Sequence, residues 1–471
     1  MEEVSVDMVV IGSGPAGQKA AIQGAKLGKN VLVLDKLNEP GGNCVYSATI
    51  PSKTLREAII DLTRFNERHF TKEDYQIGDV TIPTLNNRLQ KVIDEEKNMV
   101  VRQLKKNNIR ILFGTARFEN PHTLMLIDAE YRITHQIKSE FFVVATGSKP
   151  RTPANVPFDN EVILDSTSLL RVSKVPKTLI VLGGGIIGAE YASFFAALGT
   201  EVTIIDKKDH ILPMLDSEIG IHLQTALTDI GLRFLGKKEP ESIIRQGDRA
   251  CVTFKDGTKL EADALLYALG RVANVSSLEL DNTGIKINDR GYVPVNPLFQ
   301  TIVPNIYAVG DVIGGPCLAS TSMEQGRLAA LHAFGAQTHY FPSLYPIGIY
   351  TIPEISSCGY TEEELVEMGY HYEVGRAYYY EIARSHIVGS SVGMFKILFH
   401  AETLEILGVH IIGRAATEVI HIGLMAIGFR AKINYFIDQV FNYPTFAEGY
   451  RIAALNGVNK IKTKNGNLKP S

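Results

Sequence analysis

Two turns in the sequence share a spacing of three glycines that is followed, 18 residues after the last glycine, by an aspartate. In such a turn the first glycine allows a tight bend, the second lets the backbone approach a pyrophosphate, and the third lets helix and strand pack closely. The free N–H groups of the following helix face the phosphates, and the acid can accept hydrogen bonds from ribose hydroxyls. This chemistry is the binding of dinucleotides. The two sets are Gly12, Gly14, Gly17 and Asp35, and Gly183, Gly185, Gly188 and Asp206.

The elements that must position these residues occur twice in the chain. Residues 8–36 align without a gap to residues 179–207, and 11 of the 29 positions are identical. Each copy predicts a buried apolar strand, the glycine turn, a helix that ends at Leu-Gly, and a second apolar strand before Asp-Lys. The repeat therefore predicts two dinucleotide-binding folds, one for a group that stays bound and one for a nucleotide that visits. The repeat alone does not assign them.

Composition and charge narrow the class of protein. The 471 residues predict two to four domains, and 45% hydrophobic and 21% charged residues are typical of a soluble globular protein. With a net charge of −3 we expect no nucleic-acid partner, and the Lys-rich end at residues 459–470 is expected to be a solvated tail. We find neither a signal peptide nor an apolar run long enough to span a membrane, so no membrane partner is expected. The four dispersed cysteines form no metal-binding pair and no disulfide framework, which predicts a cytoplasmic protein without a metal site.

Six further stretches give the chain a family resemblance. With the two glycine turns, they resemble the flavin-containing pyridine nucleotide–disulfide oxidoreductases, the family of lipoamide dehydrogenase and glutathione reductase. The resemblance runs from about residue 5 to about residue 460. The stretches are GGNCVYSATIPSK (41–53), VVATGSKPRTP (143–153), YALGRVANV (267–275), NIYAVGDV (305–312), YTIPEISSCGYTEEEL (350–365) and FNYPTFAEGYRIAALNG (441–457).

The resemblance implies an α/β fold with two Rossmann-like dinucleotide-binding domains and a C-terminal α+β dimerisation domain. Residues 1–150 and 271–341 would form a split FAD-binding domain, around a nicotinamide nucleotide domain at residues 151–270. Residues 342–471 would form the dimerisation domain. In this family each active site draws on both subunits, so a homodimer, or a larger homo-oligomer, is expected.

The same resemblance implies the cofactors and their contacts. FAD would bind at the first glycine turn, and NAD(H) and NADP(H), as substrates, would bind at the second. Asp311 would hydrogen-bond to the ribityl chain of FAD. The expected contacts beyond the two turns are Lys36, Gly42, Cys44, Lys53, Gly147, Lys207, Gly270 and Asp311.

Two departures from the family pattern concern the disulfide chemistry. Cys44 matches the substrate-attacking cysteine, but the flavin-side position holds Thr49, which cannot form a disulfide. The family motif His-Pro-Thr-x-x-Glu keeps its acid as Glu448, whereas the histidine is replaced by Tyr443. A phenol with a pKa near ~10 is a poor proton shuttle at neutral pH. We therefore expect the disulfide half of the reaction to be missing and Cys44 to be a bystander.

The hydride half of the family's chemistry remains. Lys53 matches the lysine near the flavin N5, and Glu190 matches its ion-pair partner. A cationic lysine there would stabilise the anionic reduced flavin, so we expect both residues to be catalytic. A salt bridge with a structural role alone stays open, because buried pairs also occur for structural reasons.

Two stretches bring the resemblance closer to one branch of the family. ATIPSK (48–53) and FNYPTFAEGYRIAALNG (441–457) look like the soluble, FAD-dependent pyridine nucleotide transhydrogenases of bacteria. That resemblance implies hydride transfer between NADPH and NAD⁺ through FAD by a ping-pong mechanism, without a redox disulfide. Three alternatives stay open: an NADH:quinone or dye reductase, an FAD-bearing nucleotide sensor that is no enzyme, and a disulfide reductase in which Cys44 pairs with a distant cysteine.

The acid of the second turn creates a tension with that function. Asp206 should favour NAD(H), because an acid repels the 2′-phosphate of NADP(H). A like-charge contact at ~4 Å costs on the order of 1–4 kcal/mol. Lys207 and Lys208 follow directly and could offset the repulsion as point charges. We expect both nucleotides to be used, with the preference left open.

Overall fold

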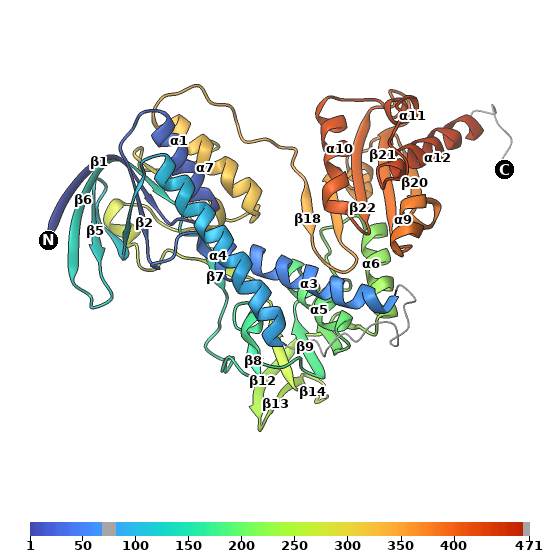
Figure 1. The fold of residues 1–471 in the computed structure, drawn as a ribbon, viewed down its shortest axis with the longest axis horizontal. Helices are drawn as coiled ribbons and strands as arrows, with labels where there is room; N and C mark the ends of the chain where they lie inside the picture. The colour runs from blue at the N-terminus through green and yellow to red at the C-terminus, as the bar shows by residue number, and fades with distance from the viewer. Residues whose placement is uncertain (68–81, 465–471) are drawn as a thin grey trace. The chain divides into compact units, whose positions relative to one another are not determined.

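The computed structural model describes residues 1–67 and 82–464 of the chain. Residues 465–471, the end of the Lys-rich tail, lie outside the described residues, so the expectation for that end is not tested. The chain divides into two compact units, and Figure 1 labels their helices and strands. The first unit holds Met1–Leu55, Pro83–Thr152 and Gly270–Pro342, and the second holds Arg56–Ile82, Pro153–Leu269 and Ser343–Ser471.

A mostly parallel sheet forms the centre of the first unit. The strand that leads into the first glycine turn, β1, lies between β2 and β6, with β3 beyond β2 and β17 beyond β6. The apolar end of β1 is buried, as expected of a parallel strand covered on both faces. Strands β4 and β5 extend the sheet in antiparallel fashion. The strands are β1 (Glu2–Ile11), β2 (Val31–Asp35), β3 (Arg110–Phe113), β4 (Thr115–Asn120), β5 (Thr123–Ile127), β6 (Ile133–Val144) and β17 (Ile306–Ala308); β7 (Ser148–Pro150) pairs with β16 (Arg271–Ala273).

The helices α1 and α7 of the first unit approach so closely at Gly326 that no side chain fits between their backbones there. A Cβ added at Gly326 in α7 would lie 2.1 Å from the carbonyl oxygen of Ala16 in α1, so only glycine permits this approach. The contact fixes α1, which starts at the first glycine turn. The helices are α1 (Pro15–Lys26), α2 (Gly42–Tyr46), α3 (Thr49–Glu67), α4 (Ile82–Lys106) and α7 (Ala319–Ala333), with 3₁₀ turns η2 (Leu280–Thr283) and η3 (Gly310–Ile313); α3 passes into the second unit at Arg56.

The second unit contains a parallel sheet built like the first. Its turn strand β9 lies between β10 and β15, with β11 beyond β10 and β8 beyond β15. The internal repeat therefore extends from the sequence to the order of the strands. A separate antiparallel sheet, β12-β13-β14, joins β11 to β15 along the chain. The elements are β8 (Ile163–Leu164), η1 (Leu169–Arg171), β9 (Thr178–Leu182), α5 (Ile186–Ala197), β10 (Glu201–Ile205), α6 (Ser217–Asp229), β11 (Arg233–Leu235), β12 (Pro240–Gln246), β13 (Arg249–Phe254), β14 (Lys259–Ala262) and β15 (Ala264–Tyr267).

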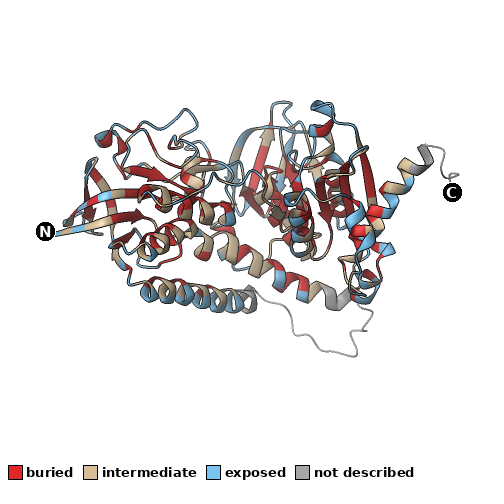
Figure 2. Ribbon diagram, turned by 90° about the horizontal axis from the view of Figure 1, so that it is seen from above, coloured by how far each residue is buried: buried red, intermediate tan, exposed pale blue. Residues whose placement is uncertain are grey.

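The rest of the second unit is an antiparallel sheet with the order β18-β19-β22-β21-β20. Its core is aromatic and aliphatic, and Phe395, Phe436 and Tyr450 are among its fully buried side chains. Figure 2, where buried residues are red, shows that most of the strands of the chain are largely buried. A Cβ at Gly375 in β20 would lie 2.1 Å from the carbonyl oxygen of Ala453 in α12, which brings this helix directly onto the sheet. The elements are β18 (Ile347–Ile349), β19 (Ile355–Gly359), α8 (Glu362–Glu367), β20 (Tyr372–Tyr378), η4 (Tyr379–Glu381), α9 (Ala383–Val388), β21 (Met394–His400), β22 (Ile406–Ile412), α10 (Ala416–Gly428), α11 (Asn434–Asp438) and α12 (Glu448–Lys464).

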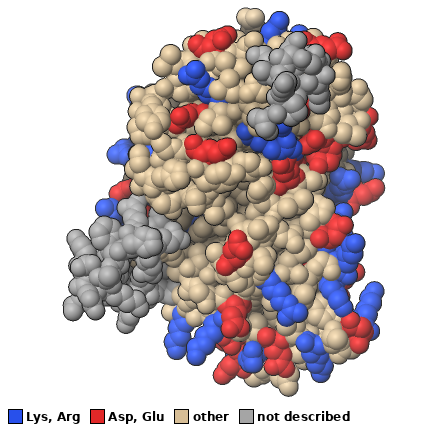
Figure 3. Space-filling model, turned by 90° about the vertical axis from the view of Figure 1, so that its right-hand side faces the viewer, with Lys and Arg blue, Asp and Glu red and all other residues tan. Residues whose placement is uncertain are grey.

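The expected α/β class, with two Rossmann-like sheets and a C-terminal α+β part, is confirmed by these sheets. The exact domain boundaries stay a prediction. Among the helices that the structure describes, none is both long and apolar enough to cross a membrane. Acidic and basic side chains are interspersed on the face shown in Figure 3.

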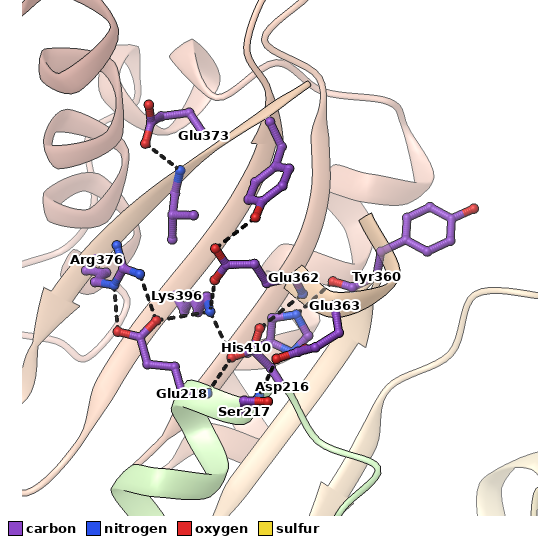
Figure 4. A network of polar contacts seen from close by, with 12 residues as sticks. Asp216, Ser217, Glu218, Tyr360, Glu362, Glu363, Glu373, Arg376, Lys396 and His410 are labelled. Carbon is purple, nitrogen blue, oxygen red and sulfur yellow. Dashed lines mark hydrogen bonds and ion pairs between the residues drawn. The ribbon is translucent and has the colours of Figure 1, made fainter. Parts of the chain in front are cut away.

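A buried cluster of charges joins the helix that follows the second repeat to the C-terminal sheet (Figure 4). The Nζ of Lys396 in β21 lies 2.8 Å from Asp216 and 3.0 Å from Glu218, and it also contacts Glu362. Asp216 caps α6 by accepting the Glu218 N–H, and it accepts the Glu362 N–H as well. Arg376 binds Glu218 through two hydrogen bonds of 2.6 and 2.8 Å. One lysine therefore holds the starts of two helices, α6 and α8, together.

The charged groups of the cluster shift the pKa values of their neighbours. Burial acts to raise the pKa of Glu218, but hydrogen bonds from Arg376 and Lys396 outweigh it and lower that pKa to about 2. Burial acts to lower the pKa of Lys396, but the carboxylates of Asp216 and Glu362 raise it above its usual value. The Glu218 contribution to stability is therefore present above its unfolded pKa and is lost as the pH falls toward about 2. The Lys396 contribution is present below its unfolded pKa and is lost as the pH rises through the folded value.

We predict that Lys396→Met destabilises the protein strongly. The substitution leaves the buried Asp216 and the partly exposed Glu218 and Glu362 without their shared cation. Removal of one partner of a buried pair costs about 3–5 kcal/mol. The apparent melting temperature, measured by circular dichroism, should fall well below that of Lys259→Met, a control at an exposed position in β14. The difference should shrink as the pH falls toward about 2, because protonation of Glu218 then removes its contribution to the stability of the wild type as well. An unchanged melting temperature in Lys396→Met would contradict the role of this cluster.

Candidate dinucleotide and redox site

The first glycine turn depends on two backbone contacts. A Cβ at Gly12, where φ is +107°, would lie 2.3 Å from the carbonyl oxygen of Ala145, at the end of β6. A Cβ at Gly17 would lie 1.9 Å from the carbonyl oxygen of Gly12. No heavy atom lies within 4 Å of the Cβ position at Gly14, which begins α1. The outer glycines are thus required by the fold, whereas Gly14 faces open space.

The acid of the first turn is held by the turn itself. Asp35 accepts the backbone N–H of Ser13 at 2.8 Å, the Ser13 hydroxyl also donates to it, and the Leu37 N–H donates at 3.0 Å. These donors fix the carboxylate next to the start of α1. Lys36, the expected neighbouring contact, is exposed.

The GGNC stretch packs directly onto the first turn. The Gly41 N–H donates to the hydroxyl of Ser13 at 3.0 Å. A Cβ at Gly42 would lie 2.9 Å from the Cα of Gly14, and φ of Gly42 is +63°. The structure therefore brings Gly42 beside the open side of the turn, as a shared dinucleotide site requires.

Cys44 lies in α2, five residues before Thr49, which starts α3 and takes the place of a second cysteine. Burial raises the pKa of the Cys44 thiol, and a hydrogen bond with the Thr49 side chain only partly opposes this effect. The thiolate is the nucleophile of disulfide chemistry, so a raised pKa weakens it. All four cysteines, which fall within the described residues, are free.

Asp311 lies in a polar group at the carboxyl ends of the central strands. The Ser148 hydroxyl donates to Asp311 at 2.6 Å, and Asn43 donates to the Ser148 carbonyl at 2.5 Å. Arg271 donates to the same serine from Nε and Nη2 at 2.7 and 2.8 Å. Gly147, with φ of +66°, precedes the serine. This group links the GGNC stretch to the acid that we expect to bind the ribityl chain.

The second turn repeats the geometry of the first. A Cβ at Gly183, where φ is +108°, would lie 2.7 Å from the carbonyl oxygen of Ala268, and one at Gly188 would lie 1.9 Å from that of Gly183. Gly185 begins α5 and, like its counterpart in the first turn, has no heavy atom near its Cβ position.

The acid of the second turn is occupied by backbone donors. Asp206 accepts the Gly184 N–H at 2.6 Å and the Lys208 N–H at 2.8 Å, one on each carboxylate oxygen. Lys207 and Lys208 are exposed. The Leu212 N–H donates to the Gly184 carbonyl at 2.9 Å, so the chain after the lysines folds back onto the turn.

The two expected catalytic residues lie on helices. Lys53 is half-buried in the first part of α3, and its Nζ lies 3.4 Å from the Ser52 hydroxyl. Glu190, in α5, is 3% exposed, and its carboxylate accepts the Tyr350 N–H at 2.8 Å. Their mutual ion pair stays a prediction.

The remaining expected positions lie in a turn, on the surface and at the start of α12. Gly270 adopts φ of +98°, and its carbonyl accepts the Arg151 N–H at 3.1 Å. Tyr443, at the position of the family histidine, is 68% exposed. The Oε2 of Glu448 is buried and has no hydrogen-bond partner among the described residues.

The residues at both turns fit dinucleotides. Neither α1 nor α5 has a side-chain cap at its start, so their first N–H groups are available to phosphates. The hydroxyl of Thr146, which lies next to Gly12 after β6, is buried and has no partner among the described residues, so it can serve a ligand. Within the same residues, no group of three or more His, Cys, Asp or Glu is arranged to hold a metal ion.

Several residues of this region were not found by sequence reasoning. They share a role in holding expected residues through contacts far along the chain, which no local spacing indicates. The only feature of the sequence that could have indicated any of them is a serine directly after a glycine, at Ser13 and at Ser148. The residues are Ser13, Asn43, Arg56, Ser148 and Arg271.

The fold and the paired turns define a class of two-dinucleotide flavoprotein folds, and comparison with known families gives the same class. The sequence pattern of the pyridine nucleotide-disulphide oxidoreductases matches residues 6–326, and that of their dimerisation domain matches residues 345–454. The chain belongs to this family, as the sequence predicted.

Comparison with curated relatives shows which branch of the family the chain is similar to. A protein named soluble pyridine nucleotide transhydrogenase from Mycobacterium bovis (strain BCG / Pasteur 1173P2) is 45% identical over 460 residues, or 98% of each chain. Proteins with the same name from Chromohalobacter salexigens and Klebsiella pneumoniae are 43% and 42% identical, and each match covers 97% of this chain and 98% of that one. The closer resemblance predicted from the sequence is therefore confirmed.

Solved structures share the fold. The HOCl-induced flavoprotein disulfide reductase RclA from Escherichia coli superposes with a TM-score of 0.86 at 28% identity, covering 95% of this chain and 99% of that one. LpdA from Mycobacterium tuberculosis gives a TM-score of 0.87 at 26% identity, covering 96% and 99%.

We predict that alanine at Gly14 or Gly185 blocks ligand binding without disturbing the fold. Space is open at both positions and φ is −67° and −76°, so a methyl group fits the chain but would collide with a pyrophosphate at the turn. Gly14→Ala should purify with native circular dichroism and at least about tenfold less bound flavin. Gly185→Ala should keep the flavin and need at least about tenfold more nicotinamide nucleotide for its reduction. Normal flavin content in the first variant, or normal reduction in the second, would contradict the assignment of that turn.

Proposed function

We propose that the protein is an FAD-dependent NAD(P)⁺ transhydrogenase, which transfers hydride between NADPH and NAD⁺. One observation carries the proposal: the chain has two glycine turns, each followed by a helix without a side-chain cap, but no second redox cysteine. Thr49 stands at the position where a partner for Cys44 would be expected. With two dinucleotide sites, one nicotinamide nucleotide can give a hydride to the flavin and another can take it back. Neither transfer needs a disulfide. The names of the curated relatives support this function.

The residues of the first unit would bind and orient FAD. The free N–H groups of α1 would hold the pyrophosphate, Asp35 the adenosine ribose, and Asp311, oriented by Ser148, the ribityl chain. FAD supplies the chemistry when bound, since it can take up a hydride from one nicotinamide and release it to another. In this proposal Lys53 stabilises negative charge at the flavin and Glu190 balances the lysine.

The second turn would admit one nucleotide at a time. Each oxygen of Asp206 already accepts a backbone N–H, which spreads part of its charge and lowers its repulsion of a 2′-phosphate. The exposed Lys207 and Lys208 lie next to it and can approach such a phosphate. These features support the use of both NAD(H) and NADP(H). No specific observation favours the quinone reductase or the non-enzymatic sensor.

We predict direct nucleotide-to-nucleotide transfer that survives loss of the lone thiol. Rapid mixing of the purified protein with NADPH should bleach the flavin, and a chromogenic NAD⁺ analogue should then restore its colour. Cys44→Ser should retain this transfer within about twofold, because burial keeps the thiol protonated. Flavin that is reduced by NADPH but not reoxidised by the analogue, or that turns over faster with a quinone, would contradict the proposal. Two new thiols per chain on reduction would indicate the disulfide reductase instead.

We also propose that two chains form a homodimer through the C-terminal domain. The match to the family's dimerisation domain supports it, as do exposed apolar side chains there, with Phe429 81% and Val440 93% exposed. A double substitution, Phe429→Glu with Val440→Glu, should give monomers in sedimentation velocity and lose most activity, because the family's sites draw on both subunits. Ile302→Glu, a control at an equally exposed apolar residue of the first unit (81%), should stay dimeric. A wild-type monomer at micromolar concentration would contradict the proposal.

The domain boundaries and the location of the protein complete the proposal. We propose a split FAD domain at 1–150 and 271–341, a nucleotide domain at 151–270 and a dimerisation domain at 342–471. The matched family patterns support this order. We place the protein in the cytoplasm, which the four free cysteines and the word soluble in the names of the relatives support.

A further inference from the structure

We propose that Arg56 is a positioning residue for the transfer reaction, because it orients Glu190 through the segment formed by residues 350–354. The inference rests on the proposed function, in which Glu190 takes part in hydride transfer. Arg56, Glu190 and the 350–354 segment all belong to the second unit.

The 350–354 segment is bound to α5 at two places. Glu190 accepts the Tyr350 N–H at 2.8 Å, and Ser193, one turn further along α5, accepts the Ile352 N–H at 3.1 Å. Glu190 is 3% exposed and Ser193 is fully buried. A buried carboxylate takes its orientation from its donors, so a shift of the Tyr350 backbone would turn the Glu190 side chain.

The opposite edge of the same segment is bound by Arg56 in α3. The Nε of Arg56 donates to the Thr351 carbonyl at 3.1 Å, and its Nη2 lies 2.9 Å from the Glu354 carboxylate. Its guanidinium also lies 5.9 Å from the centre of the Tyr350 ring. Along this segment the N–H groups of Tyr350 and Ile352 point to α5, and the Thr351 carbonyl points to Arg56. The arginine therefore fixes the carbonyl that lies between the two N–H groups held by α5.

The Arg56–Glu354 pair is itself anchored from a third side. Glu354 is 5% exposed, its carboxylate lies 3.4 Å from the Thr417 N–H and hydroxyl, and its own carbonyl accepts the Gly413 N–H at 2.8 Å. Burial raises the pKa of Glu354 although the charge of Arg56 opposes this. A rigid fork of donors at such a desolvated place fixes geometry more tightly than a lysine could.

Two contacts thus connect Arg56 to the catalytic carboxylate. Arg56 holds the Thr351 carbonyl, and the adjoining residue, Tyr350, presents its N–H to Glu190. Lys53, the other expected catalytic residue, precedes Arg56 by three positions in the same helix. The helix that carries the lysine therefore also carries the group that orients its expected partner.

A double-mutant cycle tests the inference. Arg56→Met, Glu190→Gln and the double variant are compared with the wild type in stopped-flow reduction of the bound flavin by NADH, across pH. If Arg56 acts through Glu190, Arg56→Met slows reduction by about tenfold or more and shifts the pH profile in the same direction as Glu190→Gln. The double variant should then be no slower than Glu190→Gln alone, because coupled residues are not additive. Arg56→Lys, which lacks the fork, should recover only part of the rate.

A matched control separates positioning from stability. Arg376→Met removes another arginine–carboxylate pair of the same unit, the one with Glu218, and should lower the melting temperature while the reduction rate and pH profile stay unchanged. If Arg56→Met does not fold, Glu354→Gln, which keeps the guanidinium and loses its anchor, replaces it in the cycle.

The outcomes are distinguishable. Rate losses that multiply in the double variant, or an Arg56→Met enzyme with a lower melting temperature and unchanged rate and pH profile, would overturn the inference. A wild type whose flavin is reduced by NADH but passes no hydride to a second nucleotide would overturn the proposed function alone, and the cycle would still measure the coupling of Arg56 to Glu190.

Discussion

The whole arrangement depends on backbone contacts that only glycine permits. At Gly17 and at Gly188 an added Cβ would lie 1.9 Å from the carbonyl oxygen of the glycine five residues earlier. This approach presses the start of each helix onto the end of its strand and aims its free N–H groups at one point outside the sheet. The two parallel sheets have the same strand order around these points. One steric constraint, applied twice, therefore shapes both of the proposed dinucleotide sites.

The two sites differ in what surrounds the turn, and the difference fits a resident cofactor and a visiting nucleotide. In the first, Ser13 links Asp35 to Gly41, so the GGNC stretch lies over the turn. In the second, Gly184 takes the place of that serine, and Asp206 accepts only backbone N–H groups beside exposed lysines. The separate stretch on the first turn suits a ligand that stays bound, and the exposed lysines beside the second acid suit a nucleotide with or without a 2′-phosphate.

The sequence predicted the local parts of this structure and missed the distant contacts. Glycine spacing and the following acids are set within about 30 residues, so the turns, Asp35 and Asp206 could be found from pattern alone. Ser148 with Asp311 and Arg56 with Glu354 are joined across long separations, and no periodicity reveals such a pair. The pairing of Lys396 could have been predicted from the sequence. A single lysine in the apolar strand MFKILFH must be paired if the strand is buried.

The same residues explain why loss of the disulfide need not disturb the fold. Thr49 hydrogen-bonds to Cys44, so the two side chains still meet where a cysteine pair would stand. The following turns of α3 carry Lys53 and then Arg56, whose contacts with the 350–354 segment are independent of the thiol. The helix is therefore held by its arginine and not by a disulfide at its start. A chain with this anchor can lose thiol chemistry while it keeps the helix that carries Lys53, which is the combination that the proposed hydride transfer between two nicotinamides requires.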